Sequence, residues 1–290
     1  MFARRRPIQP SCCLALTTCL LAIAAVVPRA AEAQERRYRG PDGPDLGFAN
    51  DAEIIVALRE GEIVARRTLD IGTTGVQQLD IQYDGKMLHA VFHDVDTYER
   101  NLRLRDGSSF AGFYDRFSNQ CAAYELGRLL GLDMIPPAVL RRVAGEPGAV
   151  QLWVEKTMTE GDRARRGLTP PDSGVWRQQQ ATMRTFDALI ANSDRNTGNS
   201  LIDEDWNLWL IDHSRTFQIP RGDPSYATVN QITPTFWGAL RALDETATRA
   251  RLRDYLEPAQ LTALFERHAE IVAHIEGLIE TRGAGAVLIE

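Results

Sequence analysis

The stretch "DALIANSDRNTGNSLIDEDWNLWLIDHSRTF", residues 187–217, starts as the end of a helix and finishes as a β-hairpin. Its loop, DRNTGN at 194–199, places Asp194 and Asn199 five residues apart. The segments NSLID and NLWLID then predict two short strands joined by a turn. Because this hairpin reverses the chain, we expect Asp212, at the end of its second strand, to face the loop.

These three side chains form a set with a defined chemistry. Two carboxylates and one amide that converge on a small volume supply the oxygen ligands that Mg²⁺ and Mn²⁺ prefer. A carboxylate that does not bind the metal can orient or deprotonate a hydroxyl group. Asp, Asn, Thr and Gly are also common in turns, so the loop taken alone is equally compatible with a plain polar turn.

The chain before this stretch is mainly strand-like. Short β-type runs are predicted at 53–58 and 62–71, and a hairpin over 79–96 turns at Asp84-Gly85. A helix follows over about 117–131, and a second hairpin at 138–155 turns at Gly145 to Gly148. This half of the chain therefore predicts a β-rich lobe with one helix.

The chain after residue 155 is mostly helical. The run WRQQQATMRTFDALIAN at 176–192 places Met183, Phe186 and Ile190 on one helical face. Two further segments with helical period follow the hairpin. We therefore predict an α+β fold of two lobes, with a cleft between them where a small molecule binds.

The order helix, D-x-x-x-x-N, hairpin, I-D resembles the catalytic region of kinases. The loop DRNTGN is similar to the D-R-H-x-x-N loop of phosphatidylinositol 3- and 4-kinases and HipA-like kinases, and LIDHS to their I-D-F/H-G/S segment. The segment 121–155 resembles the helix C to hinge region of the same atypical kinases, which are related to the secreted spore-coat and secretory-pathway kinases. The resemblance spans roughly 63–217.

The resemblance implies a role for each residue and a cofactor pair, Mg²⁺ or Mn²⁺ with ATP or another nucleotide. Asp194 would be the catalytic carboxylate, while Asn199 and Asp212 would bind the metal. Arg195 would support the loop, although a surface ion pair explains it equally well. His213 is interpreted as structural. The cofactor-binding residues implied are Gly72, Thr73, Thr74 and Gly75 in a turn over the phosphates, His93, Gln120, and Glu155 at the hinge.

Two of these positions depart from the kinase pattern. Kinases pair a Lys on the third strand with a Glu on helix C, and the matching positions here hold His93 and Gln120. Of the two lysines in the chain, Lys86 precedes His93 by about 23 Å along an extended strand and Lys156 lies beyond the hinge. Glu125 lies on another face of the helix, so none of these replaces the missing pair.

Residues 1–33 are typical of a cleaved signal peptide. Three arginines precede an uncharged apolar run, and Ala31-Glu32-Ala33 is a small-x-small cleavage site, which predicts a mature chain that starts at Gln34. A membrane anchor is the alternative, but the apolar run is short for a span. The expected organisation is a signal peptide at 1–33, a flexible lead-in at 34–50, an N-lobe at 51–155 and a C-lobe at 156–290.

The composition limits which binding partners and which cellular compartment fit this chain. Without residues 1–33, which carry four Arg and one Glu, the net charge moves from -6 to -9. An acidic exported chain is a poor candidate for binding nucleic acid or an anionic membrane. Cys121 remains as the single cysteine, which excludes an internal disulfide. We expect a periplasmic or extracellular protein without a stable membrane span after cleavage.

Three functional hypotheses result. The first is an exported kinase-like enzyme that transfers a phosphoryl group to a hydroxyl on a protein, a lipid head group or a small molecule. The second is an inactive pseudokinase that acts as a binding or scaffold protein, as the altered Lys–Glu pair indicates. The third, a metal-dependent hydrolase, is weaker because no His cluster completes such a site.

Overall fold

The computed structural model describes residues 38–43, 45–69, 76–103, 109–219 and 225–290. All of them belong to a unit that runs from Ala33 to Glu290. Two expected features lie outside the described residues. These are the signal peptide at 1–33 and the turn that contains Gly72, Thr73, Thr74 and Gly75.

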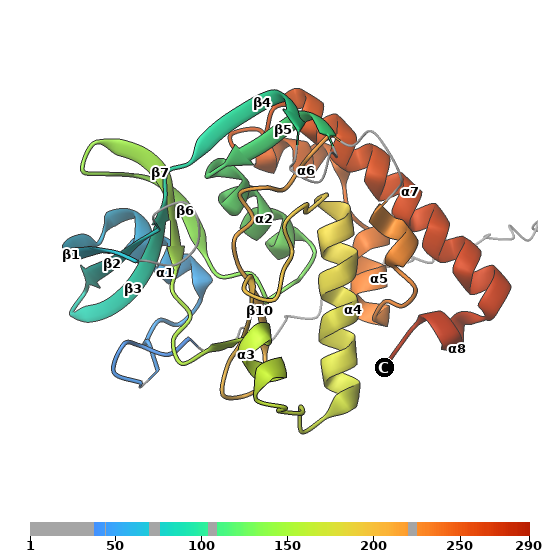
Figure 1. Ribbon diagram of the computed structural model, residues 1–290, viewed down its shortest axis with the longest axis horizontal. Coiled ribbons are helices and arrows are strands. Elements are labelled where there is room, and N and C mark those ends of the chain that lie inside the picture. Colours follow the sequence, from blue (N-terminus) through green and yellow to red (C-terminus); the bar gives the residue numbers. More distant parts are fainter. Residues whose placement is uncertain (1–37, 44, 70–75, 104–108, 220–224) are drawn as a thin grey trace, which may run out of the picture. The chain divides into compact units, whose positions relative to one another are not determined.

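The N-terminal part of this unit is an antiparallel sheet with two helices (Figure 1). Its elements are α1 (Asp51–Glu60), β1 (Glu62–Thr68), β2 (Gln77–Tyr83), β3 (Lys86–His93), β4 (Asp96–Arg103), β5 (Ser109–Arg116), α2 (Ser118–Leu129), β6 (Ala138–Val143) and β7 (Glu146–Leu152). The main sheet has five strands in the order β1-β2-β3-β7-β6. The predicted α+β class is confirmed, with one helix more than expected in this part.

Both predicted hairpins are present in the sheet. Strands β2 and β3 turn at Asp84-Gly85, where φ values of 47° and 71° are those of a tight hairpin turn. The β6–β7 turn is at Ala144-Gly145, earlier than the expected span of Gly145 to Gly148. Gly148 instead lies inside β7, where a Cβ would come within 2.3 Å of the Phe92 ring, so a side chain has no room there.

The run at 53–58, predicted as a strand, is part of helix α1. The Asn50 side chain caps the helix by accepting from the Glu53 main-chain N–H at 3.1 Å. Ile54, Ala57 and Leu58 are buried at the three- and four-residue spacing of a helix. The strand prediction was wrong because a short apolar run fits either structure, and the cap decided between them.

The side chains of strand β3 alternate between the buried core and the opposite face of the sheet. Leu88, Ala90 and Phe92 are buried in a core that α1 and strands of the main sheet share. His89 and His93 lie on the opposite face and are half-buried. Because side chains alternate along a strand, this register fixes His93 on the face away from the core.

Strands β4 and β5 form a ribbon that pairs only with itself among the described strands. The sequence alone does not predict this ribbon. Its end is fastened to the helical part, where the Arg116 guanidinium donates to Glu257 at 2.6 Å. The ribbon therefore carries Asp115, next to Arg116, into the neighbourhood of the loop at 194–199.

The C-terminal part is mainly helical, as expected (Figure 1). Its elements are β8 (Met158–Thr159), α3 (Glu160–Arg165), α4 (Ser173–Leu189), β9 (Ser200–Ile202), β10 (Leu208–Leu210), a 3₁₀ turn at Ser225–Thr228, α5 (Pro234–Arg241), α6 (Glu245–Leu252), α7 (Pro258–Arg282) and α8 (Ala284–Val287). Helix α4 contributes Phe186 and Leu189 to a core that also includes Leu264 and Ile271 of α7. The predicted hairpin is confirmed as β9–β10.

None of the helices described for this chain has the length and apolar character that a membrane crossing requires.

Candidate active site

The loop at 194–199 is built on the end of helix α4. The chain leaves the helix through Ala191, which has a positive φ of 46°. Asn192 then donates its amide N–H₂ to Asp187 Oδ1 at 2.9 Å and accepts from the Asp194 main-chain N–H at 3.0 Å. Asn199 closes the loop because its Nδ2 donates to the main-chain oxygen of Asp194 at 3.0 Å. Short polar side chains thus satisfy the backbone that the helix no longer pairs.

Arg195 joins the loop to helix α4 before it and to the end of strand β10 after it. Its Nε donates to Asp187 Oδ2 at 2.9 Å, and its Nη2 donates to Asp187 Oδ1 at 3.1 Å. Its Nη1 donates to the main-chain oxygens of Asn199 and, at 3.0 Å, Ile211. Both side chains of the Asp187–Arg195 pair are only 12% exposed. Arg195 is therefore an internal brace of the loop, and the alternative of a surface ion pair is wrong.

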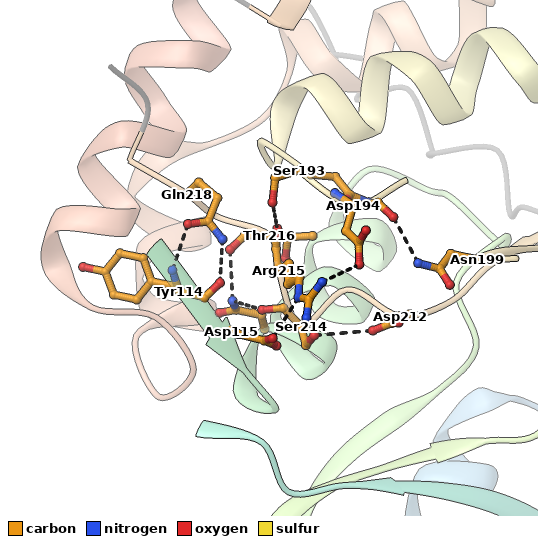
Figure 2. Close-up of polar contacts among 12 residues, drawn as sticks. Tyr114, Asp115, Ser193, Asp194, Asn199, Asp212, Ser214, Arg215, Thr216 and Gln218 are labelled. Atoms are coloured by element: carbon orange, nitrogen blue, oxygen red, sulfur yellow. Dashed lines mark hydrogen bonds and ion pairs between the residues drawn. The ribbon is translucent and has the colours of Figure 1, made fainter. Parts of the chain in front are cut away.

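The hairpin brings Asp212 to the same loop, as the sequence indicated. The Ile211 main-chain N–H donates to the Asn199 main-chain oxygen at 3.2 Å, which joins the end of β10 to the end of the loop. Asp212 follows with a φ of 56°, the left-handed conformation that Asp tolerates better than most residues. Ser214 Oγ lies 3.4 Å from Asp212 Oδ1. Asp194, Asn199 and Asp212 thus occupy adjoining segments (Figure 2).

The Asp194 carboxylate is paired with Arg215. The Arg215 Nη1 donates to Asp194 Oδ2 at 3.2 Å, and its Nε donates to Asp115 Oδ2 at 2.8 Å. Figure 2 shows this guanidinium between the two carboxylates, with Asp212 on the neighbouring segment. The hydrogen bond to Asp115 is the main reason that the pKa of Arg215 is raised, and the charges of Asp194 and Asp212 add to it.

Helix α2 packs against this segment through two buried amides. Asn119 Nδ2 donates to the main-chain oxygens of Ser214 and Thr216 at 2.7 and 2.9 Å. Gln120 Oε1 accepts from the main-chain N–H of His213 at 2.8 Å. The two amides therefore fix the backbone that follows Asp212, which accounts for an amide at position 120.

His93 on β3 faces the same region. Burial lowers its pKa, and the charges of Asp212, Asp94 and Asp115 act in the opposite direction. A lowered pKa leaves a neutral imidazole at pH 7, so His93 does not supply the positive charge of a lysine. The effect of the Asp212 charge on His93 shows that the two side chains are near enough to interact electrostatically.

His213 is fully buried behind the loop. Arg195 Nη2 lies 3.1 Å from His213 Nε2, and because the guanidinium can only donate, the imidazole nitrogen accepts. Burial lowers the pKa of His213 well below its usual value, and the charge of Arg195 lowers it further. The ring is therefore neutral and placed to support Arg195, which fits a structural interpretation.

The remaining charged residues considered from the sequence contact other groups. Glu155, three residues after the end of β7, has its Oε1 2.7 Å from Nδ1 of His89 on β3. Glu125 of α2 forms a salt bridge with Arg251 of α6, in which Oε2 and Nη2 are 2.7 Å apart. The Lys86 ammonium lies 4.5 Å from the centre of the Phe48 ring. Neither Glu125 nor Lys86 restores the altered pair.

Three residues of this network were not predicted from the sequence, which are Asp115, Asp187 and Arg215. Arg215 had a usable signal, because it follows Asp212 by three residues in the same short segment. Asp187 and Asp115 had none, because an Asp in a helix or at a strand end is ordinary. In the described part of the chain, no three or more His, Cys, Asp or Glu residues gather as a metal-binding group.

Comparisons with known proteins agree with this architecture. No protein-family model matches the chain. It is 24% identical to the glycosaminoglycan xylosylkinase of Danio rerio, over 76% of each protein.

Two solved structures are similar across most of their length. The structure of hydra Fam20 with sugar superposes with a TM-score of 0.64 at 18% identity, covering 84% of this chain and 94% of that one. The Golgi casein kinase with Mn/ADP bound superposes with a TM-score of 0.59 at 16% identity, covering 82% of this chain and 78% of that one. The chain therefore has the atypical protein kinase-like fold of these proteins.

Proposed function

We propose that this protein is an exported phosphotransferase, which binds a nucleotide with Mg²⁺ or Mn²⁺ and transfers a phosphoryl group to a hydroxyl. The observation that carries the proposal is the single brace formed by Arg195. It fixes the loop of Asp194 and Asn199 to the segment that ends at Asp212. A plain polar turn needs no buried guanidinium, whereas a catalytic constellation must be held rigidly.

Asn199 and Asp212 would hold the metal ion. The Asn199 amide nitrogen is committed to the Asp194 main-chain oxygen, so its amide oxygen is oriented away from that bond. One amide oxygen and one carboxylate suit a metal that takes its other ligands from water and phosphate oxygens. When bound, the metal neutralises charge on the phosphates.

Asp194 would act on the acceptor. Its carboxylate is 36% exposed, so a hydroxyl group can approach it. As the acceptor oxygen bonds to the terminal phosphorus, the bond from that phosphorus to the bridging oxygen breaks and the nucleoside diphosphate leaves. Asp194 accepts the proton that the hydroxyl loses. The acceptor belongs to one of three classes: a protein, a lipid head group or a small molecule.

A pseudokinase is the second candidate, and one observation favours it. The helix α2 position that would pair with a strand lysine holds Gln120, which binds the His213 main chain, and the carboxylate of the same helix, Glu125, is engaged by Arg251. A fold that keeps its metal ligands without this charge pair can bind a nucleotide without turning it over. The two candidates therefore differ in phosphoryl transfer and agree on nucleotide binding.

Thermal unfolding with and without Mn²⁺ and ATP tests the proposal. We expect the unfolding midpoint to rise only when both are present, because a metal–nucleotide complex binds the folded state alone. Asp212→Ala should abolish this rise, and Asn199→Ala should weaken it less because an amide is the poorer ligand. Asp254→Ala, at an exposed position just after α6, is the control and should behave as wild type.

Formation of ADP in the presence of hydroxyl-bearing acceptors separates the candidates. Binding with metal-dependent ADP formation supports the phosphotransferase. Binding without it supports the pseudokinase. An unchanged response in Asp212→Ala would show that the metal assignment is wrong.

Export is part of the proposal and has its own measurement. The proposed signal at 1–33 predicts that the exported protein starts at Gln34. Mass spectrometry of the intact exported protein should give that mass. A mass that still includes Met1 would contradict cleavage.

A further inference from the structure

Phosphoryl transfer needs positive charge near the transferring group, and the altered Lys–Glu pair leaves its source open. Position 93, where kinases carry the strand lysine, holds a histidine. Arg195 directs its guanidinium to Asp187, His213 and two main-chain oxygens, and it is nearly buried. Arg195 therefore has no charged donor to turn toward a ligand.

Arg215 is placed differently. Its Nη1 nitrogen lies 3.2 Å from Oδ2 of Asp194, and Asp194 is the carboxylate proposed to act on the acceptor. Its side chain is 35% exposed, about three times the exposed fraction of Arg195. Its hydrogen bonds to Asp115 and Asp194 use Nε and Nη1, and Arg carries five N–H donors in a planar fork. A partly exposed guanidinium with this many donors can bind a further ligand.

The main chain of Arg215 is fixed, which gives its side chain a defined origin. The Ser193 hydroxyl donates to the Arg215 main-chain oxygen at 3.0 Å, and the Ser193 N–H lies 3.3 Å from the same oxygen. The preceding carbonyl, of Ser214, accepts from Asn119 Nδ2 and from the Arg116 main-chain N–H. Hydrogen bonds from Ser193, from helix α2 and from the β4–β5 ribbon therefore fix the backbone of this segment.

Asp115 holds the far side of the guanidinium. The Asp115 carboxylate accepts from Arg215 Nε at 2.8 Å and is nearly buried. With Nε held by Asp115, the terminal nitrogen Nη1 is directed to Asp194 Oδ2. Such an arrangement is preorganised, because little side-chain freedom is lost when an anion binds to the terminal nitrogens.

We propose that Arg215 contacts the transferring phosphoryl group and supplies the positive charge that the strand lysine supplies in other kinases. This inference rests on the proposed function. In the protein without nucleotide, the Arg215 guanidinium pairs with Asp194. When a nucleotide is bound, the terminal nitrogens donate to the terminal phosphate, which leaves the Asp194 carboxylate to the acceptor hydroxyl. Arg215 is then a catalytic residue with two alternating partners.

The alternative is that Arg215 only positions Asp194. The two roles predict different binding. A contact with the terminal phosphate affects ligands that possess that phosphate, whereas a positioning role affects transfer and leaves both ligands equally bound. Isothermal titration with Mn²⁺ and either AMP-PNP or ADP measures this difference directly, without any turnover.

We expect Arg215→Gln to weaken AMP-PNP binding at least about tenfold and ADP binding less than about twofold, as loss of one charged hydrogen bond implies. Arg215→Lys should keep part of the preference for AMP-PNP, because a point charge remains while the fork is lost. Arg253→Gln replaces an exposed arginine of the helical part and should bind both ligands as wild type. Circular dichroism shows whether each variant is folded.

Equal losses for AMP-PNP and ADP, or no loss for either, would overturn the inference. If Arg215→Gln does not fold, Arg215→Lys and Asp115→Asn are measured instead. Asp115→Asn weakens the hydrogen bond that holds Arg215 Nε. It should lower the preference for AMP-PNP over ADP, and an unchanged preference in both variants would overturn the inference. A wild-type protein that binds neither nucleotide with Mn²⁺ would instead overturn the proposed function itself.

Discussion

Arg195 binds the carboxylate of Asp187 with two nitrogens, at 2.9 and 3.1 Å, where both side chains are almost buried. The pair joins the last turn of helix α4 to the loop that follows it. Because the same guanidinium also binds the main-chain oxygens of Asn199 and Ile211, one residue sets the spacing between the loop and the hairpin end. The stability of the fold and the geometry of the site therefore depend on the same contact.

Removal of Asp187 should destabilise the protein strongly. Asp187→Ala leaves the Arg195 charge nearly buried without its partner, which typically costs about 3–5 kcal/mol of unfolding free energy. The exposed pair of Glu245 and Arg249 offers a matched control, and Glu245→Ala should cost less than about 1 kcal/mol. Urea unfolding measures both values. Similar losses in the two variants would show that Arg195 does not organise the loop.

Replacement of Asp194 should separate binding from transfer. Asp194→Asn removes the carboxylate that is proposed to accept the hydroxyl proton, so ADP formation should fall to background. Mn²⁺-dependent nucleotide binding should remain, because Asp194 is not a proposed metal ligand. The lost ion pair with Arg215 is partly exposed and should cost no more than about 1 kcal/mol. A fully active variant would place the base elsewhere.

Restoration of the kinase ion pair should raise nucleotide affinity. In His93→Lys the new ammonium would face the charges of Asp212, Asp94 and Asp115, so this variant should fold. Gln120→Glu alone places a charge at a fully buried position and should be destabilising. The double variant should bind ATP more tightly than either single variant because the two charges compensate each other. Titration with ATP measures this, and additive effects would contradict the inferred pairing of positions 93 and 120.

The Cys121 thiol should be unreactive in the folded protein. Burial raises its pKa, and the charge of Glu125 raises it further, so the thiolate that reacts with iodoacetamide is scarce even at pH 8. Mass spectrometry of the Cys121 peptide should show labelling in guanidinium chloride and almost none in buffer. Fast labelling in buffer would show that helix α2 opens readily.

The sequence determined those features whose signals are local. The Asp84-Gly85 turn needs two positive φ values, and this dipeptide accepts them regardless of the surrounding structure. Helix α4, the loop and the β9–β10 hairpin follow one another within a short segment, so helical period, turn residues and alternation were sufficient to place Asp194, Asn199 and Asp212. The kinase-like fold was predictable from that order.

Only the tertiary structure decided what surrounds those residues. Arg215 meets Asp115 across 100 positions of sequence, and Glu125 meets Arg251 across 126. An Asp or Arg carries no local signal for such a partner, because the pairing depends on how the ribbon and the helices pack. Helix α1 shows the same limit on a smaller scale, since its apolar run fits a strand or a helix until a cap and a core select one. The sequence by itself therefore determined the chain order of the candidate site, and packing determined which charges bind one another there.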